Sequence, residues 1–168
     1  KLEQNSLYRI WSMTKPVISI VILQLIDEKK IKLNDTINYF LPIFSNLTVL
    51  KKGAKNIEET KNLIQYPTIE NLLLHTAGFS YNFLGDIVAE EYHKVGLFYS
   101  DQNTLEDEIK TLSKLPLLYE PGSRWVYSVS VDILARIIEV VENNSLQNVL
   151  KKKIFEPLKM FNTSFCLN

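Results

Sequence analysis

A serine and a lysine stand three residues apart directly before the most apolar run of the chain. Residues 11–16 read WSMTKP, and the run VISIVILQLI follows at once. Positions i and i+3 share one face of a helix, so Ser12 and Lys15 lie side by side if this segment is helical. Because the run must be buried, we expect both side chains to be drawn toward the interior, where desolvation disfavours a charged lysine. Such a lysine can accept the proton of a serine hydroxyl, as in a nucleophile with its general base.

The same spacing also has a plain structural interpretation. A serine at the start of a helix caps it, and a lysine can extend its charged end to solvent. A serine followed by a lysine three residues later is expected about once in a chain of this size. In favour of chemistry, the start of a helix offers Ser12 backbone N–H groups that are free to face an oxyanion. The spacing alone leaves both interpretations open.

Length and composition narrow the class of protein. The chain has 168 residues, 46% hydrophobic and 23% charged, which suits one soluble domain with a real core. Lys plus Arg equals Asp plus Glu, 19 each, so no charge excess favours nucleic acid or an anionic membrane. The run 17–26 is shorter than the roughly 20 residues that span a bilayer, so we expect no integral membrane segment in this chain. Cellular compartment and oligomeric state stay open.

Metal and cofactor sites are not expected. Cys166 is the single cysteine, which rules out an internal disulfide, and we expect it to be a small buried hydrophobic residue. The two histidines, His75 and His93, lack the partners of a zinc site. We therefore expect neither a metal nor a cofactor.

Hydrophobic periodicity predicts a mostly helical chain with few residues left for a sheet. Expected helix starts are capped by Thr68, by Thr104 with Asp107 as its reciprocal partner, and by Ser145. Pro121 and Gly122 suit the two central positions of a type II turn. The expected elements are a short strand at 6–12, helices at 12–29, 57–64, 68–77, 82–95, 104–115, 130–144 and 145–155, and a turn at 119–125. Residues 32–44 are expected to form a turn, a cap and one or two helical turns that Pro42 stops.

Four stretches in order resemble the serine β-lactamase-like family, which includes class C β-lactamases, DD-peptidases and family VIII carboxylesterases. The first is YRIWSMTKPVISIVILQLIDEKKIKLNDTINYFLP, which has the S-x-x-K pair of the family. The others are LLLHTAGF, EPGSRWVYSVSVDIL and IFEPLKMFNTSF, where Lys159 stands in place of the usual glycine. The resemblance covers nearly the whole chain, and four motifs in sequence are far more specific than the first alone.

The resemblance implies roles for three residues. Ser12 would be the nucleophile, Lys15 the general base, and Tyr127 a proton relay that approaches both. Tyr127 also has a structural interpretation, because a tyrosine beside a tryptophan commonly packs in the core. The family likeness implies a structural role for His75, which stands where the end of a helix is expected and can bind its last carbonyls.

The sequence departs from the lactam-acting branches at one position. Those enzymes have Y-x-N in the second motif, and the asparagine holds the substrate amide. Here the triplet is YSV, so Val129 stands at the asparagine position and cannot offer that hydrogen bond. The stretch YSVSVDILARIIE instead resembles the esterase branch. Trp11 and Trp125 flank the two motifs, so they and Val129 are candidates for substrate contact, although both tryptophans could simply pack.

We therefore expect a serine hydrolase that acts through an acyl-enzyme, as a carboxylesterase on small or medium esters. Two alternatives stay open. One is a DD-peptidase or β-lactamase acting on peptide or lactam amides, and the other is a non-catalytic binding protein of the same fold. The expected partner is a small-molecule ester or lactam substrate, without nucleic acid.

The resemblance also implies that residues 1–168 are part of a larger domain. The third motif of the family, K-T-G or H-x-G, does not occur in the expected place, and the family domain is roughly twice this length. The expected fold class is a mainly α fragment of an α/β (α+β) serine β-lactamase/DD-peptidase-like fold. It holds the helical region and the nucleophile helix, and most of the antiparallel sheet is missing. We expect the isolated fragment to be inactive.

Overall fold

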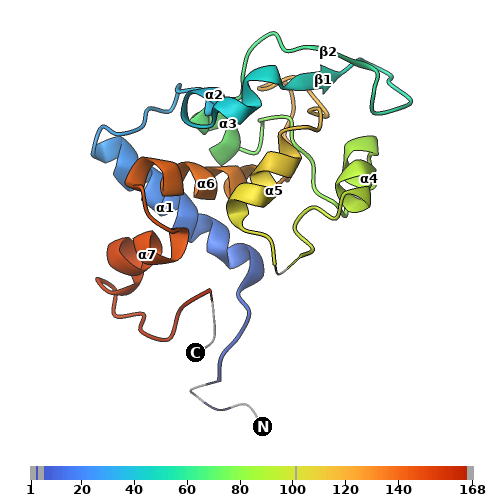
Figure 1. The fold of residues 1–168 in the computed structure, drawn as a ribbon. Coiled ribbons are helices and arrows are strands. Elements are labelled where there is room, and N and C mark those ends of the chain that lie inside the picture. Colours follow the sequence, from blue (N-terminus) through green and yellow to red (C-terminus); the bar gives the residue numbers. More distant parts are fainter. Residues whose placement is uncertain (1–2, 4–5, 101, 166–168) are drawn as a thin grey trace.

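The computed structural model describes residue 3, residues 6–100 and residues 102–165. The described chain is mostly helical, with one two-stranded sheet (Figure 1), as the sequence predicts. Short 3-10 turns at Trp11–Met13 and Pro42–Asn46 and a π-helical turn at Lys151–Phe155 extend some of the helices. The main elements are α1 (Thr14–Asp27), α2 (Ile37–Phe40), β1 (Thr48–Leu50), β2 (Thr60–Asn62), α3 (Ile69–Leu73), α4 (Ile87–Lys94), α5 (Leu105–Leu112), α6 (Ser130–Glu142) and α7 (Leu146–Leu150).

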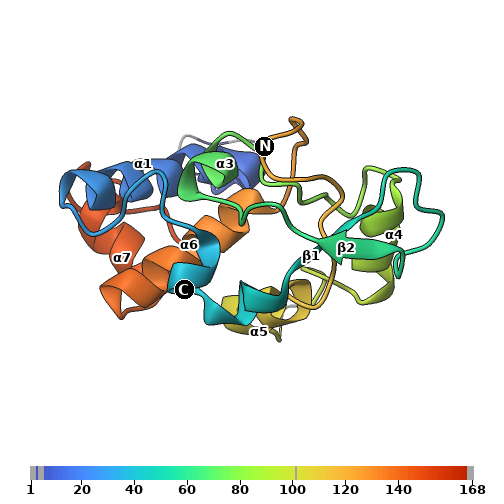
Figure 2. The same cartoon turned by 90° about the horizontal axis from the view of Figure 1, so that it is seen from above.

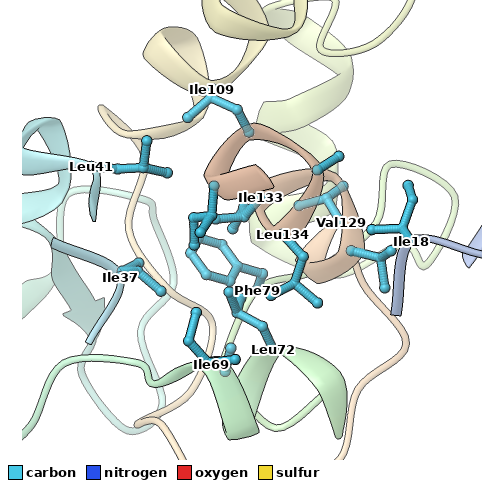
Figure 3. Close-up of a cluster of buried hydrophobic side chains, with 14 of the residues drawn as sticks. Ile18, Ile37, Leu41, Ile69, Leu72, Phe79, Ile109, Val129, Ile133 and Leu134 are labelled. Atoms are coloured by element: carbon cyan, nitrogen blue, oxygen red, sulfur yellow. The ribbon is translucent and has the colours of Figure 1, made fainter. Parts of the chain in front are cut away.

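Helices α1 and α6 pack against each other (Figures 1 and 2), and α6 also contacts α2, α3, α5 and α7. The sequence of α6 places apolar residues at helical spacing, and this stripe is buried against α1, α3 and α5. Figure 3 shows Ile18 of α1, Leu134 of α6 and Phe79 in the resulting cluster. Burial of this stripe fixes the position of α1, which carries Lys15, relative to the residues that directly precede α6.

The apolar run at 17–26 is buried on one side only, which corrects the expectation of a fully buried helix. Ile18, Val21 and Leu25 face the core, whereas Ile20 and Leu23 are about half exposed, at 47% and 51%. A helix that packs on one neighbouring face leaves its opposite face uncovered, whatever its composition. No helix in the described ranges is long and apolar enough to cross a membrane.

The predicted caps are present. The hydroxyl of Thr68 accepts a hydrogen bond from the backbone of Asn71 at the start of α3, and Asn71 bonds back to Thr68. Thr104 and Asp107 form the same reciprocal pair at α5, and Ser145 caps α7. Such caps satisfy N–H groups that would otherwise lack partners, so they fix where each helix begins.

Two predictions for local structure were wrong. The helix expected at 57–64 is instead β2, which pairs with β1 in antiparallel register, with Thr48 opposite Asn62 and Leu50 opposite Thr60. The strand expected at 6–12 is not formed, because among the described residues no strand pairs with it, and an unpaired strand is not stable. The sheet lies at the opposite end of the molecule from α7 (Figures 1 and 2).

Two helices are shorter than the sequence predicts. The helix expected over 68–77 ends at Leu73, because His75 adopts a left-handed backbone conformation with φ 55°. The helix expected from residue 82 begins only at Ile87, where the carboxylate of Asp86 accepts two backbone N–H groups. The chain between these helices is irregular and supplies part of the site described next.

Residues 122–129 form a loop that is tied to residues 75–80 by backbone hydrogen bonds. The amide of Gly122 donates to Thr76 O at 2.8 Å, and that of Val126 donates to His75 O at 2.9 Å. Gly122 has φ 81° and follows Pro121, as predicted for the second central position of a type II turn. These bonds hold the loop, and with it Tyr127, against the end of α3.

Candidate active site

Ser12 lies in the 3-10 turn that precedes α1, on the surface of the molecule. The turn is entered through Trp11, whose backbone has φ 45°, a conformation that is uncommon for a bulky residue. Ser12 is therefore presented to solvent rather than drawn into the core. This corrects the expectation of a buried serine, because burial begins only at Ile18, more than one helical turn later.

The expectation that backbone N–H groups are free near Ser12 was also wrong in part. The amide of Met13 donates to Ile10 O at 2.9 Å, and the amide of Thr14 is bound to carbonyls within the turn. A 3-10 turn bonds residues three apart, so it uses amides that the first turn of an α-helix leaves open. The amides of Met13 and Thr14 are thus committed to the turn.

Lys15 lies in the first turn of α1 and is half-buried. Its Nζ is 3.3 Å from Ser12 Oγ, to which it can donate a hydrogen bond. The same Nζ lies over the rings of Tyr127 and Tyr81, at 5.0 and 5.4 Å from their centroids. The amine therefore faces the serine, as the i, i+3 spacing predicts, and two aromatic faces hold it there.

Tyr127 completes a cluster of three polar groups. Its hydroxyl donates a hydrogen bond of 2.7 Å to Ser12 Oγ, across 115 residues of sequence. Burial opposes ionisation of the phenol, but its hydrogen bonds with Ser12 and Lys15 and the charge of Lys15 outweigh burial and lower the pKa of Tyr127. The serine oxygen thus contacts two groups that can move protons.

Aromatic side chains surround this cluster. The ring of Tyr81 stacks on that of Tyr127 with centroids 5.7 Å apart and an angle of 8° between the planes. Phe83 packs on Tyr81 at 4.7 Å, and the Trp125 ring lies 6.3 Å from His75. Tyr81 is half-buried, and burial raises the pKa of its phenol to about 12, so it is neutral at physiological pH.

His75 supports the loop that carries Tyr127. Its Nδ1 accepts a hydrogen bond from the Ser128 backbone N–H at 3.2 Å, and its ring packs on Tyr127 with centroids 5.0 Å apart. Burial, and then the charge of Lys15, lower the pKa of His75, which favours the neutral ring. These contacts are structural in kind. They act on the neighbouring loop. The sequence had instead predicted contacts with the last carbonyls of the helix.

The three residues expected to contact substrate have different surroundings. Trp11, which directly precedes Ser12 in the sequence, is 75% exposed, and Trp125, in the loop that carries Tyr127, is 67% exposed. Both rings are therefore available to a ligand. Val129 is only 1% exposed and lies in the core cluster (Figure 3). The expectation for Val129 is therefore corrected, because its side chain packs inward and offers no surface to a substrate.

Sequence reasoning missed two residues of the site. Tyr81 lies in an irregular segment without periodicity, so no pattern indicated it. Asp132 lies in the first turn of α6, and its Oδ2 is buried without a hydrogen-bond partner among the described residues. Burial raises the pKa of Asp132 to about 6, against the opposing charge of Lys15. A carboxylate at the head of an apolar stripe is the signal that could have indicated it.

No group of three or more His, Cys, Asp or Glu side chains that could hold a metal ion occurs in the part of the chain that the structure describes. Cys166, which the sequence predicts to be buried, lies outside the described residues.

The sequence, from residue 1 to residue 167, matches the protein family described as Beta-lactamase. The chain therefore belongs to this family. The order of the four motifs and the mostly helical fold agree with this assignment. The chain of 168 residues spans about 40% of the length of the curated relatives that it matches.

Three similar proteins indicate the range of the family around this chain. Esterase EstB of Burkholderia gladioli is 27% identical over 169 residues, covering 98% of this chain and 40% of the esterase. EstCE1, described as a hydrolase with promiscuous acyltransferase activity, superposes with a TM-score of 0.73 and 31% identity, over 88% of this chain and 36% of EstCE1. Simvastatin synthase (LovD) from Aspergillus terreus gives a TM-score of 0.74 and 26% identity, over 94% and 39% of the two chains.

Proposed function

We propose that the protein containing these residues is a carboxylesterase that acts through an acyl-enzyme on Ser12, with small or medium esters as substrates. The observation that carries the proposal is the pair of contacts at Ser12 Oγ, 3.3 Å from Lys15 Nζ and 2.7 Å from the Tyr127 hydroxyl. A hydroxyl held between two groups that can take or give a proton is the arrangement that nucleophilic catalysis requires. We also propose that residues 1–168 form part of one catalytic domain.

The proposed reaction has two stages. Lys15 first gives up its own proton to solvent, and its amine then takes the proton of Ser12 while Oγ attacks the ester carbonyl carbon. The proton passes through Tyr127 to the leaving alkoxide oxygen, the bond between carbonyl carbon and that oxygen breaks, and alcohol departs. Water then attacks the Ser12 ester with the same groups in reverse roles, which releases the carboxylic acid and restores the serine.

Two features favour an ester over an amide. The backbone and side chain of Val129 are engaged in the fold, so this position supplies no side-chain amide to hold a peptide or lactam. A site that recognises an amide through a hydrogen bond loses much of its selectivity without that partner. The similarity to an esterase and to a hydrolase with acyltransferase activity supports the same choice.

Acyl transfer to an alcohol is a second candidate. Ser12 is open to solvent, and the exposed rings of Trp11 and Trp125 offer apolar surface to an organic acceptor. In this candidate the acyl-enzyme is the same, and an alcohol replaces water in the second stage. The two candidates therefore differ only in product, which an assay with added alcohol separates.

Turnover of a short-chain p-nitrophenyl ester by the full-length protein tests the proposal. We expect release of nitrophenol by the wild type, loss of turnover in Ser12→Ala and normal turnover in Ser19→Ala, which removes a serine hydroxyl from α1, the helix that follows Ser12. Turnover in Ser12→Ala equal to wild type would reject the proposal. Chromatography of the products in the presence of an alcohol then distinguishes a free acid, as hydrolysis requires, from a new ester.

A further inference from the structure

An exposed aromatic ring lies beside the phenol that is proposed to relay protons. Three rings contact that of Tyr127, those of His75, Tyr81 and Phe83, with centroids 5.0, 5.7 and 6.5 Å away. His75 and Tyr81 are half-buried, whereas Phe83 is 65% exposed. Of the three, Phe83 is therefore the ring that offers most of its surface to another molecule.

Phe83 stands in a short turn that is fixed at both ends. The amide of Leu84 donates a hydrogen bond of 3.0 Å to Tyr81 O, which closes the turn. Ser80, just before the turn, is fully buried, and its hydroxyl bonds the carboxylate of Asp86, the residue that caps α4. The Phe83 ring also packs on that of Tyr81, with centroids 4.7 Å apart. The exposed ring is thus held in one place.

The surface that Phe83 offers is apolar. The Lys15 amine lies over the rings of Tyr81 and Tyr127, at 5.4 and 5.0 Å from their centroids, so the charge of the site is held by these two neighbours. Leu84 follows Phe83 and is 42% exposed, which extends the apolar surface. Such a surface gains free energy when another apolar or aromatic group covers it.

The two exposed tryptophans of the site are placed differently. Trp125 lies against His75, with ring centroids 6.3 Å apart, and Trp11 directly precedes the nucleophile in the sequence. In the described ranges of the chain, neither tryptophan forms a ring contact with Tyr127, whose ring neighbours are those given above. Phe83 is therefore the exposed ring that the fold places against the proton relay.

The proposed chemistry decides which half of an ester lies beside Phe83. In the first stage Tyr127 passes a proton to the leaving oxygen, so this oxygen must come within hydrogen-bond reach of the Tyr127 hydroxyl. The acyl half instead becomes bonded to Ser12 Oγ. A group carried by the leaving alcohol therefore lies on the side of Tyr127 and of the ring that contacts it.

We propose that Phe83 is a specificity-determining residue that binds the alcohol half of the ester, and that the preferred substrates are esters of apolar, above all aromatic, alcohols. This inference rests on the proposed acyl-enzyme function. Phe83 changes no bond, and its contact is equally strong in the bound substrate and in the transition state. Such uniform binding lowers KM and leaves kcat unchanged. An alcohol that accepts the acyl group binds the same surface, because it takes the place of the leaving alcohol.

A structural alternative assigns Phe83 to packing alone. Single exposed apolar residues are common on protein surfaces, and Phe83 already packs on Tyr81. In that case removing the ring loosens the cluster around Tyr127 and lowers kcat for every ester alike. The two explanations therefore differ in whether the loss depends on the alcohol.

Two isomeric esters separate these explanations in the full-length protein. Benzyl acetate carries its phenyl ring on the alcohol half and methyl phenylacetate carries it on the acyl half, whereas their atomic composition is the same. We expect Phe83→Ala to raise KM for benzyl acetate roughly threefold to thirtyfold with kcat little changed. Both parameters for methyl phenylacetate should stay those of the wild type. Phe83→Tyr, which keeps an aromatic ring, should keep the wild-type KM for both esters.

Tyr39→Ala is the matched control. Tyr39 is another exposed aromatic residue, 74% exposed, and its ring contacts Phe40 of α2. We expect this variant to hydrolyse both esters as the wild type does. An equal rise in KM for benzyl acetate in Tyr39→Ala and Phe83→Ala would show a general effect of lost surface rings and reject the specificity role.

The remaining outcomes are also decisive. In Phe83→Ala, equal losses for the two esters, a loss confined to methyl phenylacetate, or no change each reject the specificity role. The acyl-enzyme stands in all three cases if Ser12→Ala abolishes turnover of both esters, whereas full turnover in Ser12→Ala rejects the function itself. If Phe83→Ala does not fold, Phe83→Leu carries the test. We then expect KM for benzyl acetate alone to rise roughly twofold to tenfold, and an unchanged KM overturns the inference.

Discussion

The hydroxyl of Tyr127 lies 2.7 Å from Ser12 Oγ, although 115 residues separate them in the sequence. Packing of α1 on α6 and the backbone bonds between the Tyr127 loop and the end of α3 bring the two together. The serine is exposed, whereas the elements that hold its partners are anchored in the core. The site is thus positioned by a rigid framework and is open on one side.

Replacing Tyr127 by phenylalanine removes the hydroxyl and keeps the ring stacked on Tyr81. We predict a fall in kcat of roughly a hundredfold to ten-thousandfold with little change in KM, because proton transfer is lost and packing is not. Ester turnover of the full-length protein measures it. Tyr39→Phe, which removes an exposed phenol on α2, is the control and should match the wild type. Equal loss in both variants, or none in Tyr127→Phe, contradicts the relay role.

Replacing Lys15 by methionine should raise the pH at which Tyr127 ionises. The hydrogen bond and the positive charge of Lys15 both lower the pKa of the phenol, so removing them moves the pKa upward. Ultraviolet titration of tyrosinate measures the shift, with the corresponding Tyr127→Phe protein subtracted from each curve. An unchanged or lower ionisation pH in the methionine variant would show that Lys15 does not act on the phenol.

Introducing asparagine at position 129 should not create an amide-binding site. Val129 is buried in the core, so an asparagine there would hide a polar amide from water at a cost of about 1–3 kcal/mol. We predict a lower melting temperature and no gain in hydrolysis of a chromogenic cephalosporin. A gain in lactam turnover with unchanged stability would mean that this side chain reaches the substrate.

The packing of α6 on α1 should dominate the stability of the described fold. Leu134 is fully buried between them and is seen in the cluster of Figure 3. We predict that Leu134→Ala lowers the free energy of unfolding by about 2–5 kcal/mol, whereas Leu158→Ala, at an exposed position, changes it little. Urea denaturation of the two variants measures the difference. A loss of under 1 kcal/mol at Leu134 would contradict the assigned core.

Features that depend on local spacing could be predicted from the sequence. The side-by-side placement of Ser12 and Lys15, the apolar stripe of α6 and the caps at Thr68 and Thr104 each follow from a few neighbouring residues. The family resemblance rested on motifs in order, and it indicated Tyr127, which no periodicity would have selected.

Features that depend on tertiary pairing could not be predicted. Residues 60–62 form a strand because β1 lies beside them, and their own composition gives no strong signal. Ser12 is exposed because its turn precedes the buried part of α1. The average hydrophobicity of the apolar run does not show at which residue burial begins. Asp132 drew no attention, because the burial that raises its pKa depends on how α6 packs in the fold.

Covalent labelling of Ser12 tests the central claim most directly. The full-length protein is treated with a fluorophosphonate, and intact mass followed by peptide mapping locates the adduct. We predict one phosphonyl group on Ser12 in the wild type and in Ser19→Ala, and none in Ser12→Ala. An unlabelled wild type, or an adduct that persists at another residue when Ser12 is alanine, would contradict the claim that this hydroxyl is an activated nucleophile.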